Sequence, residues 1–148
     1  MDTIRQILDK KGNDVFSVAP DATVFDALTL MANKNIGAVL VLDGEKLVGI
    51  LSERDYARKV ALKGKWSREV LVKEIMSGEV ICVDPDQTIE NVKAIMINKR
   101  IRHLPIMEEN KLTGIVSIGD IVNAVLDQKT FMIDQLYTYI HGIPSPDK

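Results

Sequence analysis

The sequence predicts an α+β fold in which two tandem β-α-β-β-α units pack as a pseudo-two-fold pair, with additional helices on either side. Three observations predict this fold. Short β-branched runs, typical of strands, alternate with segments of helical periodicity. Clusters of Gly, Pro, Asn and Asp separate these segments. The whole order of elements then occurs a second time, and Val80 opens the second copy 65 residues after Val15.

The repetition is a sequence duplication, because it extends beyond shared apolar periodicity. Between residues 15–60 and 80–125, 16 of the 46 paired positions are identical without a gap. A half of about 50 residues is near the lower limit for an independent core, so each unit is expected to cover an apolar face of the other. The matches at turn, cap and junction positions include Pro20/Pro85, Thr23/Thr88, Gly49/Gly114, Ser52/Ser117 and Asp55/Asp120.

Each copy is expected to contain one helix at its centre and one at its end. Thr23 caps the central helix of the first copy, and Ser52 caps a second helix that continues to about residue 62. Thr88 and Ser117 have the same places in the second copy. Apolar and β-branched runs predict strands at residues 15–18, 38–42 and 47–51, and again at 80–83, 103–107 and 112–116.

The flanking segments complete the expected domain organisation. Ile4, Ile7 and Leu8 have helical spacing, and Thr130–His141 carries further apolar residues, so a helix is expected near each end. The residues between the two copies are polar and lack a period, as in a linker. The expected parts are an N-terminal helix 1–12, a first unit 13–62, a linker 63–72, a second unit 73–127, and a C-terminal helix with a disordered tail 128–148.

Composition excludes several classes of function. The 148 residues are 46% apolar and 27% charged with a formal net charge of -2, so no bulk attraction to nucleic acid or to an anionic membrane is expected. No apolar run approaches the roughly 20 residues of a membrane-spanning helix. The N-terminus lacks the layout of a secretory signal. The single cysteine, Cys82, fits a reducing compartment, and the expected location is the cytoplasm.

The junctions at Ser52 and Ser117 are the features that indicate function. In each copy an apolar run ends at the serine, and an aspartate follows three residues later at the start of a helix. One such pair alone is typical of a capping box. Its presence in both copies also favours ligand binding. An ionised carboxylate accepts hydrogen bonds from both hydroxyls of a ribose, while serine and free helix N–H groups donate to phosphate or sugar oxygens.

These motifs resemble a tandem pair of cystathionine-β-synthase (CBS) domains. The resemblance covers about residues 13–127 and rests on the Val-x-Pro-Asp-x-Thr openings, on the strand that begins His103-Leu104-Pro105-Ile106, and on two Gly-Ile-x-Ser-x-x-Asp junctions. It implies a Bateman module of the kind found in stand-alone bacterial-type CBS-pair proteins. Such modules bind adenosine-containing ligands, among them AMP, ADP, ATP, S-adenosylmethionine and NAD, in clefts between the two units.

The resemblance also implies the residues of each site. The pairs Ser52/Asp55 and Ser117/Asp120 match the family's junction motif, in which the aspartate holds the ribose diol. Similar proteins build each cleft from both units. Asp55 is therefore expected to share a site with Cys82, Arg102 and His103. Asp120 is expected to share one with Ser17, Ile36 and Gly37.

The two copies differ where phosphate contacts are expected. Arg102-His103 in the second copy replaces Gly37-Ala38 of the first, so only one copy supplies cationic donors from this strand. The resemblance implies that these donors face the phosphates in the cleft of Asp55. We expect that cleft to prefer ADP, ATP or NAD, and the less charged cleft of Asp120 to prefer AMP or a nucleoside-like group.

The expected function is a non-catalytic regulatory module that requires no cofactor and binds an adenosine-containing small molecule. The flanking helices carry apolar faces, so a homodimer is expected, and an unidentified protein is a further possible partner. Two alternatives stay open. One is a structural or protein-interaction module with empty clefts, and the other is an enzyme that uses Asp55 or Asp120 as a general base on a bound nucleotide.

Motifs for other chemistry are absent from the sequence. It contains no P-loop, no Gly-x-Gly-x-x-Gly and no nucleophile elbow. Cys82 has no partner at metal-ligand spacing, and its place in an expected strand predicts a small core residue.

Overall fold

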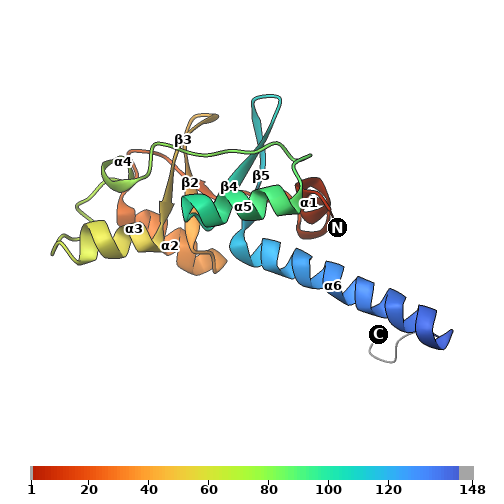
Figure 1. Cartoon of the computed structure of the whole chain (residues 1–148). Helices are drawn as coiled ribbons and strands as arrows, with labels where there is room; N and C mark the ends of the chain where they lie inside the picture. Colours follow the sequence, from red (N-terminus) through yellow and green to blue (C-terminus); the bar gives the residue numbers. More distant parts are fainter. Residues whose placement is uncertain (1, 144–148) are drawn as a thin grey trace. The chain divides into compact units, whose positions relative to one another are not determined.

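The computed structural model describes residues 2–143 (Figure 1). The chain forms two compact units. One unit is Asp14–Cys82, called the contiguous unit, and the other joins Met1–Asn13 with Val83–Lys148 and is called the divided unit. The α+β class is confirmed, with a small sheet and covering helices in each unit. The part of the expected tail beyond residue 143 lies outside the described residues.

The contiguous unit is built around a three-stranded sheet in the order β1-β2-β3. β1 pairs in parallel with β2, and β2 pairs antiparallel with β3. Thr23 caps α2 as expected, because its Oγ1 accepts a hydrogen bond from the Asp26 N–H at 3.1 Å. The elements are β1 (Ser17–Val18), α2 (Val24–Lys34), β2 (Ala38–Asp43), β3 (Lys46–Ser52), α3 (Glu53–Tyr56), the π-helix η1 (Ala57–Ala61) and α4 (Val72–Ile75).

The segment expected as a polar linker contributes to the core of the contiguous unit. Val70 and Val72 are buried among side chains from α2, β2 and β3. The Val24 N–H donates to the carbonyl of Val70, and the Val72 N–H donates to the carbonyl of Ala22, both at 2.8 Å. The sequence did not predict this burial. The residues before Val70 are polar, and two valines alone are too few to show the periodicity of a helix or a strand.

The divided unit contains a two-stranded antiparallel sheet. The strand expected at residues 80–83 is reduced to one parallel bridge between Val83 and Ile106. Cys82, expected as a small core residue, is exposed instead. The elements are α1 (Ile4–Lys11), α5 (Ile89–Lys99), β4 (His103–Glu108), β5 (Lys111–Ser117) and α6 (Ile118–His141).

The last helix, α6, is a single helix of 24 residues. The sequence predicted two helices, one after Ser117 and one over Thr130–His141. Residues 127–130 contain neither glycine nor proline, so nothing in the chain interrupts the helix between these two segments. The expected boundary between residues 127 and 128 therefore lies inside α6.

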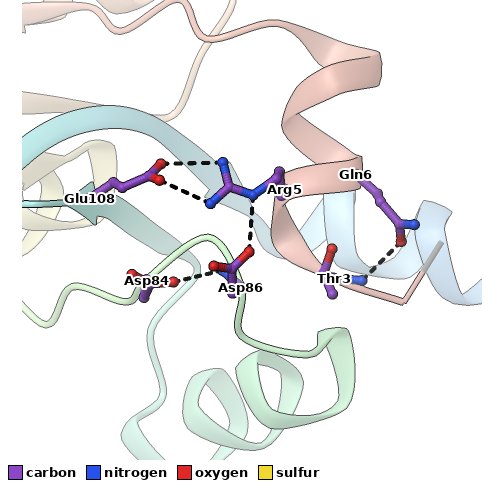
Figure 2. Close-up of polar contacts among 6 residues, drawn as sticks. All are labelled: Thr3, Arg5, Gln6, Asp84, Asp86 and Glu108. Atoms are coloured by element: carbon purple, nitrogen blue, oxygen red, sulfur yellow. Dashed lines mark hydrogen bonds and ion pairs between the residues drawn. The ribbon is translucent and has the colours of Figure 1, made fainter.

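The N-terminal helix α1 packs on the second repeat, within the divided unit. Its Ile4, Ile7 and Leu8 are buried. The Ile4 N–H donates to the carbonyl of Gln87 at 3.0 Å, and the Arg5 N–H donates to that of Pro85 at 2.8 Å. Figure 2 shows the guanidinium of Arg5 between two carboxylates. It pairs with Asp86 at 3.0 Å and binds both oxygens of Glu108 at 3.0 and 3.3 Å.

The short helix α4 has the same place in the contiguous unit. The Val72 N–H bonds to Ala22, the Lys73 N–H bonds to Pro20, and Lys73 pairs with Asp21 at 2.9 Å. Each of these contacts repeats a contact of α1. The segments Thr3–Leu8 and Leu71–Met76 are therefore equivalent, and each helix precedes one repeat in sequence but packs on the other. Their spacing is 68 residues (71 − 3), three more than in the rest of the duplication.

Two glycines allow these added helices to approach the sheets. A Cβ on Gly49 would lie 2.5 Å from Sδ of Met76 and 3.0 Å from the carbonyl oxygen of Ser77. A Cβ on Gly114 would lie 2.8 Å from a methyl group of Leu8. Met76 and Leu8 occupy equivalent positions, so both Gly-Ile pairs leave room for a neighbouring helix.

Candidate functional site

The junction of the contiguous unit is a closed capping box. The Ser52 N–H donates to Oδ2 of Asp55 at 2.9 Å, and the Asp55 N–H donates to Oγ of Ser52 at 3.1 Å. The Ser52 hydroxyl also lies 3.0 Å from Oδ2. Both side chains are half-buried. The motif therefore forms a helix-capping box in this unit, as one copy alone would suggest. The box places the half-buried carboxylate of Asp55 where β3 ends and α3 begins.

The junction of the divided unit has the same geometry. The Ser117 N–H donates to Oδ2 of Asp120 at 2.8 Å, and the Asp120 N–H donates to Oγ of Ser117 at 3.1 Å. This box begins α6, whereas the first begins the four-residue α3. The duplication therefore places a hydroxyl, a carboxylate and a helix N-terminus together twice.

Each junction is hydrogen-bonded to the residue just before the first strand of its antiparallel pair, β2 or β4. The Glu53 N–H donates to the carbonyl of Gly37 at 3.0 Å, and the Ile118 N–H donates to that of Arg102 at 2.8 Å. In the antiparallel pairs, Ala38 lies opposite Ser52, and His103 lies opposite Ser117. The chain thus brings position 37 to the Asp55 junction and positions 102 and 103 to the Asp120 junction.

The remaining predicted site residues are also located. Ser17 is exposed on β1 and pairs with Leu40, two residues along β2 from the partner of Ser52. Ile36 is half-buried and directly follows the left-handed Asn35 that ends α2. Cys82, the last residue of the contiguous unit in sequence, is exposed. The predicted grouping of Asp55 with Cys82, Arg102 and His103, and of Asp120 with Ser17, Ile36 and Gly37, combines residues of different units and stays a prediction.

A lysine lies beside each junction aspartate, and the sequence-based prediction of the site included neither of them. Lys59 Nζ is 3.4 Å from Oδ1 of Asp55 and donates to the carbonyl of Ile75 at 2.9 Å. Lys11 Nζ is 2.7 Å from Oδ2 of Asp120 and donates to the carbonyl of Ile115 at 2.9 Å. The contact of Lys59 with Asp55 could have been predicted from their i, i+4 spacing on one helix. The contact of Lys11 with Asp120 could not be predicted in this way, because the two residues are 109 positions apart in the sequence.

The environment of Asp120 stabilises its ionised form. Burial acts to raise the pKa of Asp120, but hydrogen bonds from Lys11 and Ser117 and the charge of Lys11 outweigh it, so the pKa lies below the ordinary carboxyl value. Burial lowers the pKa of His103, and the charges of Lys11 and Arg102 lower it further, while Asp120 acts in the opposite direction. At neutral pH this junction therefore contains an anionic aspartate and a neutral imidazole.

The lowered pKa of His103 predicts a loss of stability on acidification. The unfolded chain takes up a proton near pH 6.5, while the folded protein resists it, so the free energy of unfolding falls as the pH decreases through this range. Urea unfolding between pH 7.5 and 5.5 should show a weaker pH dependence for His103→Asn than for the wild type. His141→Asn, which removes an exposed imidazole at the end of α6, is the matched control for the substitution itself. An unchanged slope in His103→Asn would contradict the assignment.

Comparison with known proteins identifies the family. A family model for the CBS domain matches residues 4–62 and 72–127, which together include both junctions and the helices α1 and α4. The chain belongs to the CBS-domain family. The resemblance seen in the duplicated motifs is thereby confirmed, and the chain is a CBS pair.

Relatives of this CBS pair extend over most of its length. The mitochondrial CBS domain-containing protein CBSX3 of Arabidopsis thaliana is 34% identical over 149 residues, which cover 95% of this chain and 72% of that protein. The structure of a CBS-domain protein from Burkholderia ambifaria is similar with a TM-score of 0.83 and 44% identity, covering 84% of this chain and 94% of the other. A hexameric CBS-CP12 protein from bloom-forming cyanobacteria has a TM-score of 0.72 and 30% identity, covering 81% and 70%.

The chain is accordingly a CBS-pair regulatory module, a type that commonly binds nucleotides in other proteins. In residues 2–143, none of the helices is long and apolar enough to cross a membrane. Over the same residues, the His, Cys, Asp and Glu side chains form no group of three or more that would hold a metal ion.

Proposed function

We propose that this CBS pair senses adenosine-containing ligands, of which AMP, ADP, ATP or NAD are the candidates, in clefts to which both units contribute. The observation that carries the proposal is the pair of equivalent junctions. Each has a half-buried aspartate fixed by a serine at a helix N-terminus. One copy alone would be a helix cap, but the duplication retains hydroxyl and acid at both places.

The junctions have the chemistry that a ribose and a phosphate require. An ionised aspartate accepts hydrogen bonds from vicinal hydroxyls, and the first N–H groups of a helix attract anions. In the proposed arrangement, Asp55 and Asp120 hold the ribose diols. Arg102 and His103 are proposed as phosphate contacts in the cleft of Asp55, with Cys82 as a neighbour. Ser17, Ile36 and Gly37 are proposed to line the cleft of Asp120.

The test is a thermal-shift panel with AMP, ADP, ATP, NAD and S-adenosylmethionine, together with mass spectrometry of small molecules that co-purify. A ligand present at 100 times its dissociation constant stabilises the folded protein by about 2.7 kcal/mol, so the unfolding temperature should rise measurably. Guanosine and cytidine monophosphates at the same concentration are the controls. If no adenosine ligand shifts the transition, the clefts are empty, and the protein-interaction alternative is favoured.

The proposed sensor is not an enzyme, needs no cofactor and binds neither nucleic acid nor membrane. The single cysteine and the near-neutral charge favour the cytoplasm. Incubation with ATP, NAD or S-adenosylmethionine should return each ligand unchanged. Turnover that Asp55→Ala abolishes would overturn this part of the proposal.

The exposed face of α6 supports a homodimer as the assembled form. Five apolar side chains recur at helical spacing along one side of this helix, which is about 36 Å long at 1.5 Å per residue. A contiguous exposed apolar stripe is typical of a protein–protein contact, and a hexameric relative indicates that CBS pairs of this type assemble. The exposed residues of the stripe are Val122, Leu126, Ile133, Leu136 and Ile140.

A charged residue in this stripe should dissociate the proposed homodimer. Leu136→Glu removes an apolar contact and would bury a carboxylate, so the dimer is expected to weaken by about tenfold or more. Sedimentation equilibrium at micromolar concentration measures the change. Gln135→Glu, one residue away on the other side of α6, is the matched control and should leave the dimer intact. A wild-type protein that sediments as a monomer would refute the proposed assembly.

A further inference from the structure

The ion pair between Lys11 and Asp120 distinguishes the divided unit from its counterpart. The distance from Nζ to Oδ2 is 2.7 Å, and the side chains are 34% and 21% exposed, so much of the pair is shielded from solvent. The corresponding distance from Lys59 to Asp55 is 3.4 Å, and Lys59 is 45% exposed. The carboxylate of Asp120 therefore has the closer and less exposed cation.

The position of Lys11 follows from the length of α1. The equivalent helix α4 has four residues and ends at Ile75, whereas α1 has eight and continues to Lys11. The additional turn carries the lysine to the start of α6. There the ammonium is held between the carbonyl of Ile115 and the carboxylate of Asp120. An ammonium has three N–H donors, so one donor is not used by these two contacts.

We infer that Lys11 makes the Asp120 junction selective for adenosine ligands that carry an anionic group, an inference that rests on the proposed function. Oδ2 of Asp120 already accepts hydrogen bonds from the Ser117 N–H and from Lys11. A carboxylate oxygen offers about two such positions. A ribose diol that binds both carboxylate oxygens must therefore displace Lys11 from Oδ2.

The ligand decides whether this displacement is compensated. A phosphate beside the ribose gives the released ammonium a new charge-assisted hydrogen bond, whereas an uncharged nucleoside leaves it without an anionic partner. The surrounding charges act in the same direction. Two cations, Lys11 and Arg102, and one carboxylate, Asp120, act electrostatically on His103, which lies opposite Ser117. This junction thus attracts anionic ligands, in contrast to the less charged cleft expected from the sequence.

Calorimetric titration with AMP and with adenosine tests the inference. Every variant carries Asp55→Asn, so that the Asp120 junction dominates the signal. Lys11→Met should tighten adenosine binding and weaken AMP binding, lowering the ratio of the two affinities by about tenfold or more, the size of one charge-assisted hydrogen bond. Lys11→Arg should retain the preference for AMP. The matched control is Lys10→Met, which removes the neighbouring lysine and its ion pair with Asp127, and it should leave the ratio unchanged.

The outcomes separate this inference from the proposed function. If both ligands bind and Lys11→Met does not alter the ratio of their affinities, the proposed role of Lys11 is wrong. The proposed adenosine site is unaffected by that result. Absence of binding in every variant overturns the proposed function at this junction, and the role of Lys11 with it. Urea unfolding of each variant shows whether the fold is retained, and Lys11→Arg supplies the comparison if Lys11→Met is unstable.

Discussion

The double variant Asp55→Asn/Asp120→Asn is expected to bind AMP about 10- to 150-fold more weakly than the wild type. A hydrogen bond to a charged group contributes roughly 1.5–3 kcal/mol, which corresponds to about a 10- to 150-fold change for each site that loses its carboxylate. Asparagine has nearly the same shape, and its side-chain oxygen still accepts the N–H of Ser52 or Ser117, so the caps are retained. Isothermal titration calorimetry measures the affinity.

A third aspartate in the chain provides the control for this experiment. Asp26 follows the capping Thr23 by three residues, as Asp55 follows Ser52, but it begins α2 rather than a junction helix. Asp26→Asn changes the same chemical group at the same helical position and should leave AMP affinity unchanged. Wild-type affinity in the double variant would refute the ribose-binding role of the junctions. Equal losses in the control would indicate a general effect on folding.

The variant Ile4→Ala is expected to lower the free energy of unfolding by about 2–5 kcal/mol. Ile4 is completely buried, at 0% exposure, and its backbone N–H bonds to the second repeat at Gln87. Truncation removes apolar contacts and leaves a cavity between α1 and the rest of the divided unit. Urea unfolding followed by circular dichroism measures the change. A loss of less than about 0.5 kcal/mol, the range of a neutral surface substitution, would contradict the docked position of α1.

Two further variants make this result specific. Val72, at the equivalent position of α4, is also completely buried, so Val72→Ala should destabilise the protein by about 2 kcal/mol. Asp9→Ala changes an exposed residue on the same helix as Ile4 and should have almost no effect. Together they separate the burial of each added helix from a general sensitivity of the N-terminus.

The local features of the fold and of the candidate site were predictable from the sequence. The caps at Thr23, Ser52, Thr88 and Ser117 depend on residues three positions apart, and the structure contains all four. The duplication also predicted that both junctions would have one geometry. Such features depend on short-range hydrogen bonds, which the sequence specifies directly.

Features that depend on distant segments were not predictable in the same way. The helical period of Ile4, Ile7 and Leu8 indicates that one face of α1 is buried, but it does not say against which unit. The similarity of Thr3–Leu8 to Leu71–Met76 was the missing signal. A change of spacing from 65 to 68 residues removes it from a comparison at constant offset. Without the position of α1, the contact of Lys11 with Asp120 cannot be inferred.

The strand expected at residues 80–83 failed for a related reason. Its apolar residues satisfy the pattern of a strand, yet only Val83 pairs with β4. Four apolar residues favour an extended backbone. Whether they pair in a sheet depends on the position of a partner strand, which these four residues do not determine. The exposure of Cys82 follows, since the expected sheet does not enclose it.

The division of one unit into two segments imposes an order of assembly during synthesis. The contiguous unit has all its residues once Cys82 has left the ribosome, whereas α1, which is made before this unit, docks on residues that include Gln87 and Gly114. At 5–20 residues per second, the chain between Lys11 and Ser117 takes roughly 5–20 s to appear. For that interval the apolar face of α1 has no permanent partner and is available to chaperones. Helix α1 is therefore placed only after all residues of the contiguous unit have been made.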